Sequence, residues 1–264
     1  MFKNKTVLVT GGTGSFGKKF LETISRKYGN QIKKLIIFSR DELKQYEMSQ
    51  IYDQNKYPYI RFFIGDVRDR ERVYKALKDV DYVIHAAALK QVPTSEYNPF
   101  ETIKTNVLGT QNIVDACIDN NVKKLVSLST DKASSPINLY GASKLCADKL
   151  VSASQNTKGK VDYTACVVRY GNVMGSRGSV LPEFIKQSKN NLFKITSADM
   201  TRFNILLEEG VELVLWSLKN AKGGEIAVPK IPSFKIVDLA KAIGPACKIK
   251  IVGIRPGEKI HEEM

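Results

Sequence analysis

A tyrosine and a lysine stand four residues apart, as Tyr140 and Lys144 of the segment YGASK. On a helix this spacing places the phenol and the ammonium group on one face. A tyrosine normally keeps its proton until about pH 10, but a neighbouring lysine ammonium favours the phenolate. The two residues could therefore take a proton from an alcohol. The same pattern also arises by chance on solvated helices, so it needs support from elsewhere in the chain.

A hydroxyl, a carboxylate and an amine follow one another upstream, as Thr130, Asp131 and Lys132. The hydroxyl of Thr130 could hydrogen bond the same substrate oxygen as the tyrosine. An acid and a base beside it would permit elimination: once C4 of a hexose is a ketone, the proton at C5 becomes acidic and can leave as the C6 hydroxyl departs. The alternative is that Asp131 and Lys132 pair with each other or cap a turn, and the residues alone favour neither.

A glycine-rich segment, TGGTGSFG, follows the first hydrophobic run and precedes a helical pattern. Glycines in such a turn let the backbone approach a pyrophosphate, and the free N–H groups of the following helix point at that anion. Because the segment joins the first strand and the first helix of an alternating pattern, it predicts a dinucleotide site. The candidate contacts are Gly11, Thr13, Gly14, Ser15, Phe16 and Gly17.

The end of the second hydrophobic run bears on which dinucleotide binds. A carboxylate there would bind the ribose hydroxyls of NAD, whereas a basic residue accommodates the additional phosphate of NADP. Ser39 and Arg40 favour NADP, with Lys44 one turn further on. Asp41 keeps NAD open. We therefore expect NADP, with NAD as the less favoured alternative.

Two further strand ends complete the predicted cofactor site. Asp66 and Val67 follow the third run, where a carboxylate can meet the adenine edge. Ala86 and Ala87 follow the fourth run, where small side chains let a dinucleotide lie close to the backbone. His85 lies within that apolar run, and we interpret it as a structural histidine rather than a catalyst.

Short apolar runs alternate with longer segments of helical spacing up to residue 170. The runs are nearly continuous in Val, Ile and Leu, which is typical of parallel strands covered on both faces. The pattern predicts an α/β fold: a Rossmann-type doubly wound parallel sheet over residues 1–170, and a small substrate-binding lobe over residues 171–264, parts of which return to the Rossmann core. The expected strands are Lys5–Thr10, Leu35–Ser39, Arg61–Gly65, Tyr82–Ala86, Lys124–Ser129 and Thr164–Arg169, and the expected helices are Gly17–Tyr28, Asp41–Gln54, Asp69–Leu77, Pro99–Asp119 and Leu139–Gln155.

The composition excludes several classes of protein. The formal net charge is +14, but the lysines are spread along the chain without a cluster of basic and aromatic residues, so we expect no nucleic-acid partner. No apolar run reaches the ~18 residues of a membrane span. Four cysteines without a CxxC pair and only two histidines predict a reduced, cytoplasmic protein with no metal centre. The cysteines are Cys117, Cys146, Cys166 and Cys247.

The glycine loop, the strand-end hydroxyl and the Tyr-x-x-x-Lys pair, in this order, resemble the extended short-chain dehydrogenases/reductases. Longer stretches, among them HAAALKQVPTSEYNPFETIKTN, LSTDKASSPINLYGASK and VGIRPGEKIHEEM, resemble more narrowly the inverting UDP-N-acetylglucosamine 4,6-dehydratases, which open the bacterial route to pseudaminic acid. The resemblance implies tightly held NADP, C4 oxidation assisted by Tyr140 with Lys144, and elimination with Lys132 as base and Asp131 as acid. It also implies a 4-keto-6-deoxy-L-sugar product and a homo-oligomer, either a dimer or a hexamer.

The same resemblance points to residues that would bind the UDP-sugar. Asn172, Arg255 and Glu258 match positions that contact the uridine diphosphate in that family. Lys90, Arg177 and Arg202 are further candidates near the phosphates or the sugar, since guanidinium groups suit phosphate oxygens.

Two other functions remain open at this stage. A UDP-sugar 4-epimerase would need Tyr140 and Lys144 but no Asp-Lys pair. A non-enzymatic Rossmann protein that senses NADP would tend to lose the tyrosine, so its presence argues against that function. The chain also departs from the dehydratase pattern: Gln91 stands where a histidine is usual, Ser135 replaces a common asparagine, and the chain ends at Met264 whereas family members continue for tens of residues.

Overall fold

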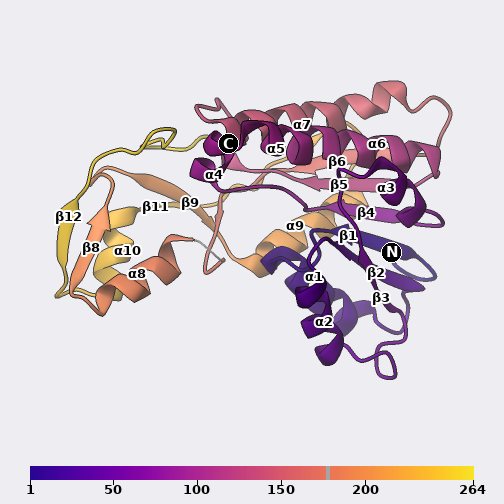
Figure 1. The fold of residues 1–264 in the computed structure, drawn as a ribbon, viewed down its shortest axis with the longest axis horizontal. Helices are drawn as coiled ribbons and strands as arrows, with labels where there is room; N and C mark the ends of the chain where they lie inside the picture. Colours follow the sequence, from indigo (N-terminus) through magenta and orange to yellow (C-terminus); the bar gives the residue numbers. More distant parts are fainter. Residues whose placement is uncertain (177–178) are drawn as a thin grey trace.

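Six of the hydrophobic runs and one further short segment form a single parallel sheet (Figure 1). The computed structural model describes residues 1–176 and 179–264. The strands lie in the order β10-β6-β5-β4-β1-β2-β3, and each pairs in parallel with its neighbours. This confirms the predicted doubly wound α/β fold. The strands are β1 (Thr6–Thr10), β2 (Lys34–Ser39), β3 (Ile60–Ile64), β4 (Tyr82–His85), β5 (Lys124–Leu128), β6 (Thr164–Val168) and β10 (Ile226–Ala227).

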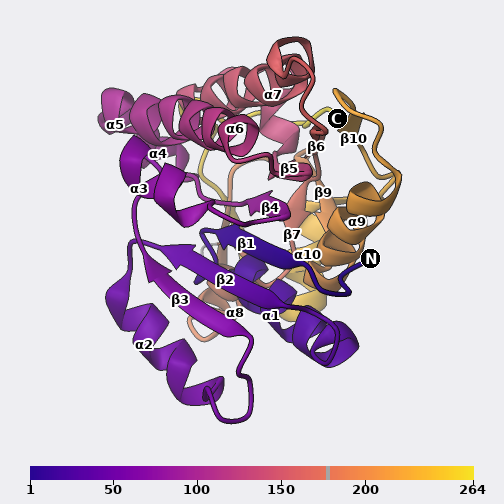
Figure 2. The same ribbon diagram turned by 90° about the vertical axis from the view of Figure 1, so that its right-hand side faces the viewer.

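Helices cover both faces of this sheet (Figure 2). On one face α1 (Ser15–Tyr28), α2 (Glu42–Ile51) and α9 (Leu207–Asn220) bury apolar side chains against the strands. On the other face α3 (Arg70–Ala76), α6 (Gly109–Asp119) and α7 (Leu139–Thr157) do the same. All five residues of β1 are buried, because this strand lies inside the sheet, between β4 and β2, and helices cover both faces. Its apolar run therefore needs no polar alternation.

The segment expected as one helix over residues 99–119 is divided in the structure. It consists of α5 (Pro99–Ile103), a π-helical turn over Lys104–Leu108, and α6. Within the wide turn, the side chain of Asn106 accepts a hydrogen bond from Leu89 N and donates to Leu89 O, at 2.8 and 2.9 Å. A π turn widens the helix by one residue and often occurs near a functional site. Here it lets Asn106 hold the loop between β4 and α4 (Val92–Tyr97).

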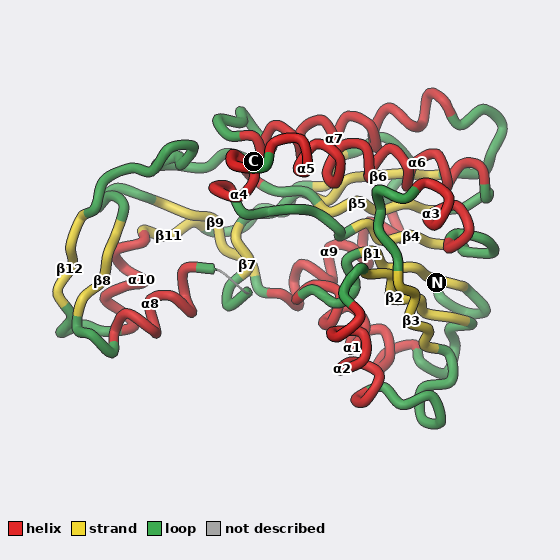
Figure 3. Tube along the Cα trace, in the orientation of Figure 1, coloured by secondary structure: helices red, strands yellow, loops and turns green. Residues whose placement is uncertain are grey.

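A smaller group of elements lies beside the large sheet (Figure 3). It has its own apolar core, which includes Phe184, Phe193 and Met200. Its elements are β7 (Asn172–Val173), α8 (Val180–Ser188), β8 (Leu192–Ile195), β9 (Thr201–Ile205), β11 (Ser233–Lys235), α10 (Ile236–Ile243) and β12 (Lys248–Ile251).

Three parts of residues 171–264 lie against the larger unit instead. Helix α9 packs on α1, and β10 pairs with β6 at the edge of the sheet. The chain after β12 runs back to the larger unit (Figure 1), where the side chain of Glu263 accepts a hydrogen bond from the Ser135 hydroxyl at 2.9 Å. Within residues 1–176 and 179–264, no helix is both long and apolar enough to span a lipid bilayer.

Candidate active site

The glycine loop lies between the end of β1 and the start of α1. Gly11 has a φ of +63°, and a Cβ there would lie 2.9 Å from backbone atoms of Ala87. A Cβ on Gly17 would lie 2.3 Å from Gly12 O, so the first turn of α1 packs directly on the loop. The N-cap of α1 is Gly14, which has no side chain to occupy the free N–H groups of the first turn. The loop is therefore shaped for close backbone approach and has donors available for an anion.

The residues at the end of β2 and just after it differ in how many hydrogen bonds and ion pairs they form within the protein. The carboxylate of Asp41 caps α2, accepting a hydrogen bond from Lys44 N at 3.0 Å, and it also pairs with the Lys44 ammonium. The hydroxyls of Ser39 and Thr13 are 2.8 Å apart. Arg40 is 53% exposed and approaches Asp66 at 3.5 Å. The carboxylate that could favour NAD is thus tied into a helix cap, while Arg40 extends from the end of the strand.

Asp66 lies at the end of β3 beside two guanidinium groups. Burial opposes its ionisation, but hydrogen bonds from the side chain and backbone of Arg68, with the nearby Arg40 charge, lower the pKa of Asp66 below its ordinary value. At neutral pH it is therefore a carboxylate. His85, by contrast, is fully enclosed between the Thr10 and Thr110 hydroxyls, at 2.8 and 3.0 Å, and burial lowers its pKa to about 3. It is a neutral structural histidine, as its place in an apolar run suggests.

The first turns of α7 bring Tyr140 and Lys144 to the end of β5. Asn138 caps this helix by accepting a hydrogen bond from Gly141 N at 2.8 Å. Burial raises the pKa of Tyr140, the Thr130 hydroxyl lowers it, and the charges of Asp131 and Asp148 raise it. A catalytic phenolate therefore needs a cation nearby.

Lys144 is the cation nearest in sequence to this phenol on the same helix. Burial lowers the pKa of its ammonium group, and the carboxylate of Asp148, one turn further along α7, raises it. Asp148 is itself fully buried, and it accepts hydrogen bonds from Ser129 and Arg169, both at 2.8 Å. The charge balance around the phenol thus depends on a buried carboxylate as well as on Lys144.

Thr130, Asp131 and Lys132 form the turn that follows β5. The Thr130 hydroxyl donates to Asp131 Oδ1 at 2.9 Å, and Lys132 Nζ lies 3.1 Å from the same oxygen. Asp131 is fully buried, whereas Lys132 lines the cleft in front of it. The acid and the base do pair with each other, and the pair lies at the same strand end as Tyr140.

A cleft of about 1350 Å³ joins the glycine loop to the smaller lobe. Of the residues singled out from the sequence, Gly17 and Asp131 lie behind its surface, and Arg177 falls outside the described residues. All the others line it: Gly11, Thr13, Gly14, Ser15, Phe16, Ser39, Arg40, Lys44, Asp66, Val67, Ala86, Ala87, Lys90, Thr130, Lys132, Tyr140, Lys144, Asn172, Arg202, Arg255 and Glu258.

The sequence suggests that the Arg202 guanidinium group binds the phosphates or the sugar, but in the structure this group is bonded to the protein backbone. Arg202 is 6% exposed, and its guanidinium group donates to the carbonyl oxygens of Thr201, Ile260 and Lys259, at 2.7, 3.0 and 2.9 Å. It anchors the C-terminal segment, which we define as residues 252–264. Arg255, in contrast, is 71% exposed and meets Glu258 at 3.1 Å. Arg255 is therefore the more accessible cation on this side of the cleft.

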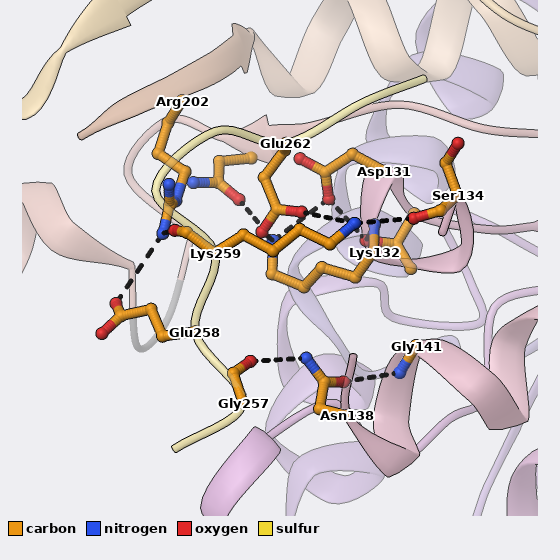
Figure 4. Close-up of polar contacts among 12 residues, drawn as sticks. Asp131, Lys132, Ser134, Asn138, Gly141, Arg202, Gly257, Glu258, Lys259 and Glu262 are labelled. Carbon is orange, nitrogen blue, oxygen red and sulfur yellow. Dashed lines mark hydrogen bonds and ion pairs between the residues drawn. The ribbon is translucent and has the colours of Figure 1, made fainter. Parts of the chain in front are cut away.

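Three polar side chains near the site were not identified from the sequence. Asn106 binds the loop before Lys90, Asp148 supports α7, and Glu262 lies 3.2 Å from Lys132 Nζ (Figure 4). Asn106 and Glu262 lie within the family-like stretches but gave no sign of a role there, and each of the three reaches the site through a contact between segments apart in the chain. Only the burial of their polar or charged groups could have drawn attention to them, and a sequence does not reveal the burial of an isolated polar residue.

The comparisons with known proteins agree with this architecture. The family described as "Polysaccharide biosynthesis protein" matches residues 7–264. The chain belongs to this family.

Relatives of the chain carry two different activities in their names. The UDP-N-acetylglucosamine 4,6-dehydratase (inverting) of Campylobacter jejuni is 55% identical, over 100% of this chain and 78% of the relative. A UDP-glucose 4-epimerase of Rickettsia canadensis is 48% identical, also over 100% of this chain and 78% of the relative. Among solved structures, Pen from Bacillus thuringiensis is similar with a TM-score of 0.93 and 41% identity, over 99% of this chain and 81% of that chain.

Proposed function

We propose that the protein is an inverting UDP-N-acetylglucosamine 4,6-dehydratase. The observation that carries this function is the Asp131–Lys132 pair, in which Lys132 lines the same cleft as Tyr140 and Asp131 lies directly behind it, because an epimerase needs the tyrosine but not the pair. The 55% identity to the Campylobacter jejuni enzyme of that name supports the same conclusion. The product would be a UDP-4-keto-6-deoxy-hexosamine of L configuration.

The cleft fits a nicotinamide dinucleotide at the glycine loop. The close approach of Gly11 to Ala87, and the uncapped start of α1, would accommodate the pyrophosphate. We propose NADP rather than NAD, since Asp41 is engaged in capping α2 while Arg40 is 53% exposed and held by a 3.5 Å contact with Asp66, from which it could turn toward an additional phosphate. When bound, the dinucleotide would supply reversible hydride transfer, from C4 of the sugar and back to C6.

Tyr140 and Thr130 would act at the C4 oxygen. The phenolate of Tyr140 would accept the proton of the C4 hydroxyl, with the Lys144 ammonium stabilising its negative charge. The Thr130 hydroxyl lowers the pKa of Tyr140 and would hold the same substrate oxygen in place. These residues serve oxidation at C4 whether an epimerisation or an elimination follows.

Lys132 and Asp131 would act at C5 and C6. Nζ of Lys132 donates a hydrogen bond to Oδ1 of Asp131 at 3.1 Å. Along this hydrogen bond a proton would pass from Nζ to the carboxylate during the reaction, which would give the amine base and the carboxylic acid that elimination requires. Lys132 faces the cleft and would remove the C5 proton, and the proton held by Asp131 would pass to the departing C6 oxygen.

The other end of the cleft would bind the nucleotide. Arg255 and Glu258 in the C-terminal segment and Asn172 on β7 are the proposed contacts of the uridine diphosphate, with Lys90 near the sugar or phosphates. The expected homo-oligomer, the cytoplasmic location and a role in pseudaminic acid synthesis stay predictions.

The deciding experiment is NMR of the purified protein with UDP-N-acetylglucosamine in D₂O, without added cofactor. We expect a C6 methyl signal, a 4-keto sugar and deuterium at C5, with the C5 coupling pattern reporting inversion. The epimerase is the second candidate, favoured by the 48% identity to the protein of that name from Rickettsia canadensis. A 4-epimer as the only product would replace our proposal with that function.

A further inference from the structure

Three segments of the chain converge on the amine of Lys132 (Figure 4). Asp131 Oδ1 lies 3.1 Å from Nζ on the same turn, and Asn172 Oδ1 lies 3.4 Å away on β7. The third oxygen is Oε1 of Glu262, at 3.2 Å, which comes from the C-terminal segment. The amine thus donates hydrogen bonds to Asp131 and Asn172 and forms an ion pair with Glu262.

Glu262 is a buried charged residue, although its neighbours in the C-terminal segment are exposed or half-buried. Its carboxylate is 3% exposed, and it lines the cleft. Its second oxygen, Oε2, is buried without a hydrogen bond and has Lys259 Nζ as an ion-pair partner at 3.9 Å. A buried carboxylate is costly unless a cation compensates it. Lys132 and Lys259 together balance the charges of Asp131 and Glu262.

We propose that Glu262 is a positioning residue for the amine of Lys132 in the elimination step. The inference rests on the proposed dehydratase function and deepens it. A lysine side chain has a flexible four-carbon stem, and one carboxylate on its own turn fixes the distance of Nζ but not its direction. A second carboxylate, brought by the C-terminal segment, adds the contact that fixes this direction.

The placement of Glu262 also links substrate binding to this step. Glu262 lies four residues after Glu258, and the backbone between them is held by the guanidinium group of Arg202. The same segment is tied to the catalytic turn by Lys259, whose Nζ donates to Ser134 O at 2.8 Å. A uridine diphosphate bound at Arg255 and Glu258, with its phosphates at the Arg255 guanidinium group, would therefore secure the segment that holds Glu262 against Lys132.

The test separates C4 oxidation from elimination in single-turnover experiments with UDP-N-acetylglucosamine. The near-ultraviolet absorbance of the reduced cofactor reports the first step, and NMR in D₂O reports the C6 methyl and the C5 deuterium. The variants are Glu262→Gln, which keeps the length and an oxygen acceptor, and Glu262→Asp, which keeps the charge. The matched control is Glu263→Gln, because Glu263 is an adjacent exposed glutamate that bonds Ser135 instead.

We expect Glu262→Gln to form reduced cofactor at the wild-type rate and to make the C6 methyl about 100-fold more slowly, since misplacing a catalytic group by about 1 Å has that effect. Reduced cofactor should then accumulate, with KM unchanged. Glu262→Asp should recover part of the elimination rate, and Glu263→Gln should match the wild type. Unchanged elimination in Glu262→Gln, or parallel loss of both steps in both Glu262 variants, would overturn the inference. A wild-type enzyme that forms no C6 methyl would instead overturn the proposed function, and the inference with it.

Discussion

The hydroxyl of Thr130 faces two groups that titrate or carry charge. It donates to Asp131 Oδ1 at 2.9 Å, and its contact with Tyr140 lowers the pKa of that phenol. If Tyr140 acts as the base for the C4 hydroxyl, activity rises with pH as the phenol loses its proton. The position of the acidic limb of the pH–rate profile therefore reports the pKa of Tyr140, and with it the groups that surround the phenol oxygen.

Replacing Thr130 by Val removes the hydrogen bond that lowers the pKa of Tyr140. The pKa should rise, so a higher pH is needed to form the phenolate, and the acidic limb of the profile for kcat should move to higher pH. We expect a shift of about 0.5 to 1 pH unit, because a hydrogen bond contributes about 1 kcal/mol and one pKa unit corresponds to about 1.4 kcal/mol. The variant Thr130→Ser keeps the hydroxyl and should keep the wild-type limb. An unshifted limb in Thr130→Val would mean that Tyr140 is not the group being titrated.

Asp148 should have the opposite effect on the profile. Its carboxylate raises the pKa of both Tyr140 and Lys144, so the substitution Asp148→Asn lowers both. The phenolate would form at lower pH, and the lysine ammonium would also be lost at lower pH. The whole active range should therefore move toward acid by roughly one pH unit, the scale of a buried charge interaction. The exposed Asp119→Asn serves as a control, and movement of only one limb in Asp148→Asn would show that one of the two groups is not involved.

At the scale of elements, the catalytic turn and α7 meet with almost no space between them. A Cβ on Gly141 would lie 2.2 Å from Lys132 O and 3.1 Å from Pro136 Cβ. The absence of a side chain at this position lets the helix that carries Tyr140 pack directly on the turn that carries Lys132. The relative placement of the two catalytic groups depends on this contact.

The substitution Gly141→Ala should therefore separate α7 from the turn. We expect a loss of roughly 1–3 kcal/mol in the free energy of unfolding, as for other overpacked sites. The elimination rate should fall more than substrate affinity. The control is Gly210→Ala in α9, where a Cβ would meet the Tyr170 ring at an ordinary 3.8 Å, so the change should be neutral or stabilise the helix by up to about 1 kcal/mol. Denaturant unfolding of both variants measures the difference, and equal stabilities would contradict the packing argument.

The elements themselves were largely predictable from the sequence. The six expected strands begin and end within one residue of β1 to β6, because near-continuous Val, Ile and Leu mark buried parallel strands. The π turn before α6 was not predicted, since it depends on Asn106 reaching Leu89, a tertiary contact that leaves the helical periodicity of the chain intact. Strand β10 was missed because its two residues give no periodic signal.

At the scale of the whole molecule, the C-terminal segment joins the two ends of the cleft. The cofactor loop and the Tyr-x-x-x-Lys pair could be recognised because their residues are close in sequence and need particular types. Glu262 could not, because it lies 130 residues after Lys132 and meets it only when the segment folds back across the lobe. For the same reason Arg202 suggested a phosphate ligand, while its buried guanidinium group holds the backbone of this segment.

The substitution Arg202→Lys should loosen that segment without removing a charge. An ammonium group cannot reproduce the fork that serves the carbonyl oxygens of Lys259 and Ile260. Amide hydrogen exchange of the residues around Glu262 should become about tenfold faster, because a hydrogen bond to a charged group contributes roughly 1.5 kcal/mol. The control is Arg61→Lys, which makes the same exchange at a guanidinium group that bonds carbonyl oxygens near β3. If the segment is what couples nucleotide binding to Lys132, Arg202→Lys should also weaken UDP binding and slow elimination together. Faster exchange with normal elimination would show instead that Lys132 keeps its position without the segment.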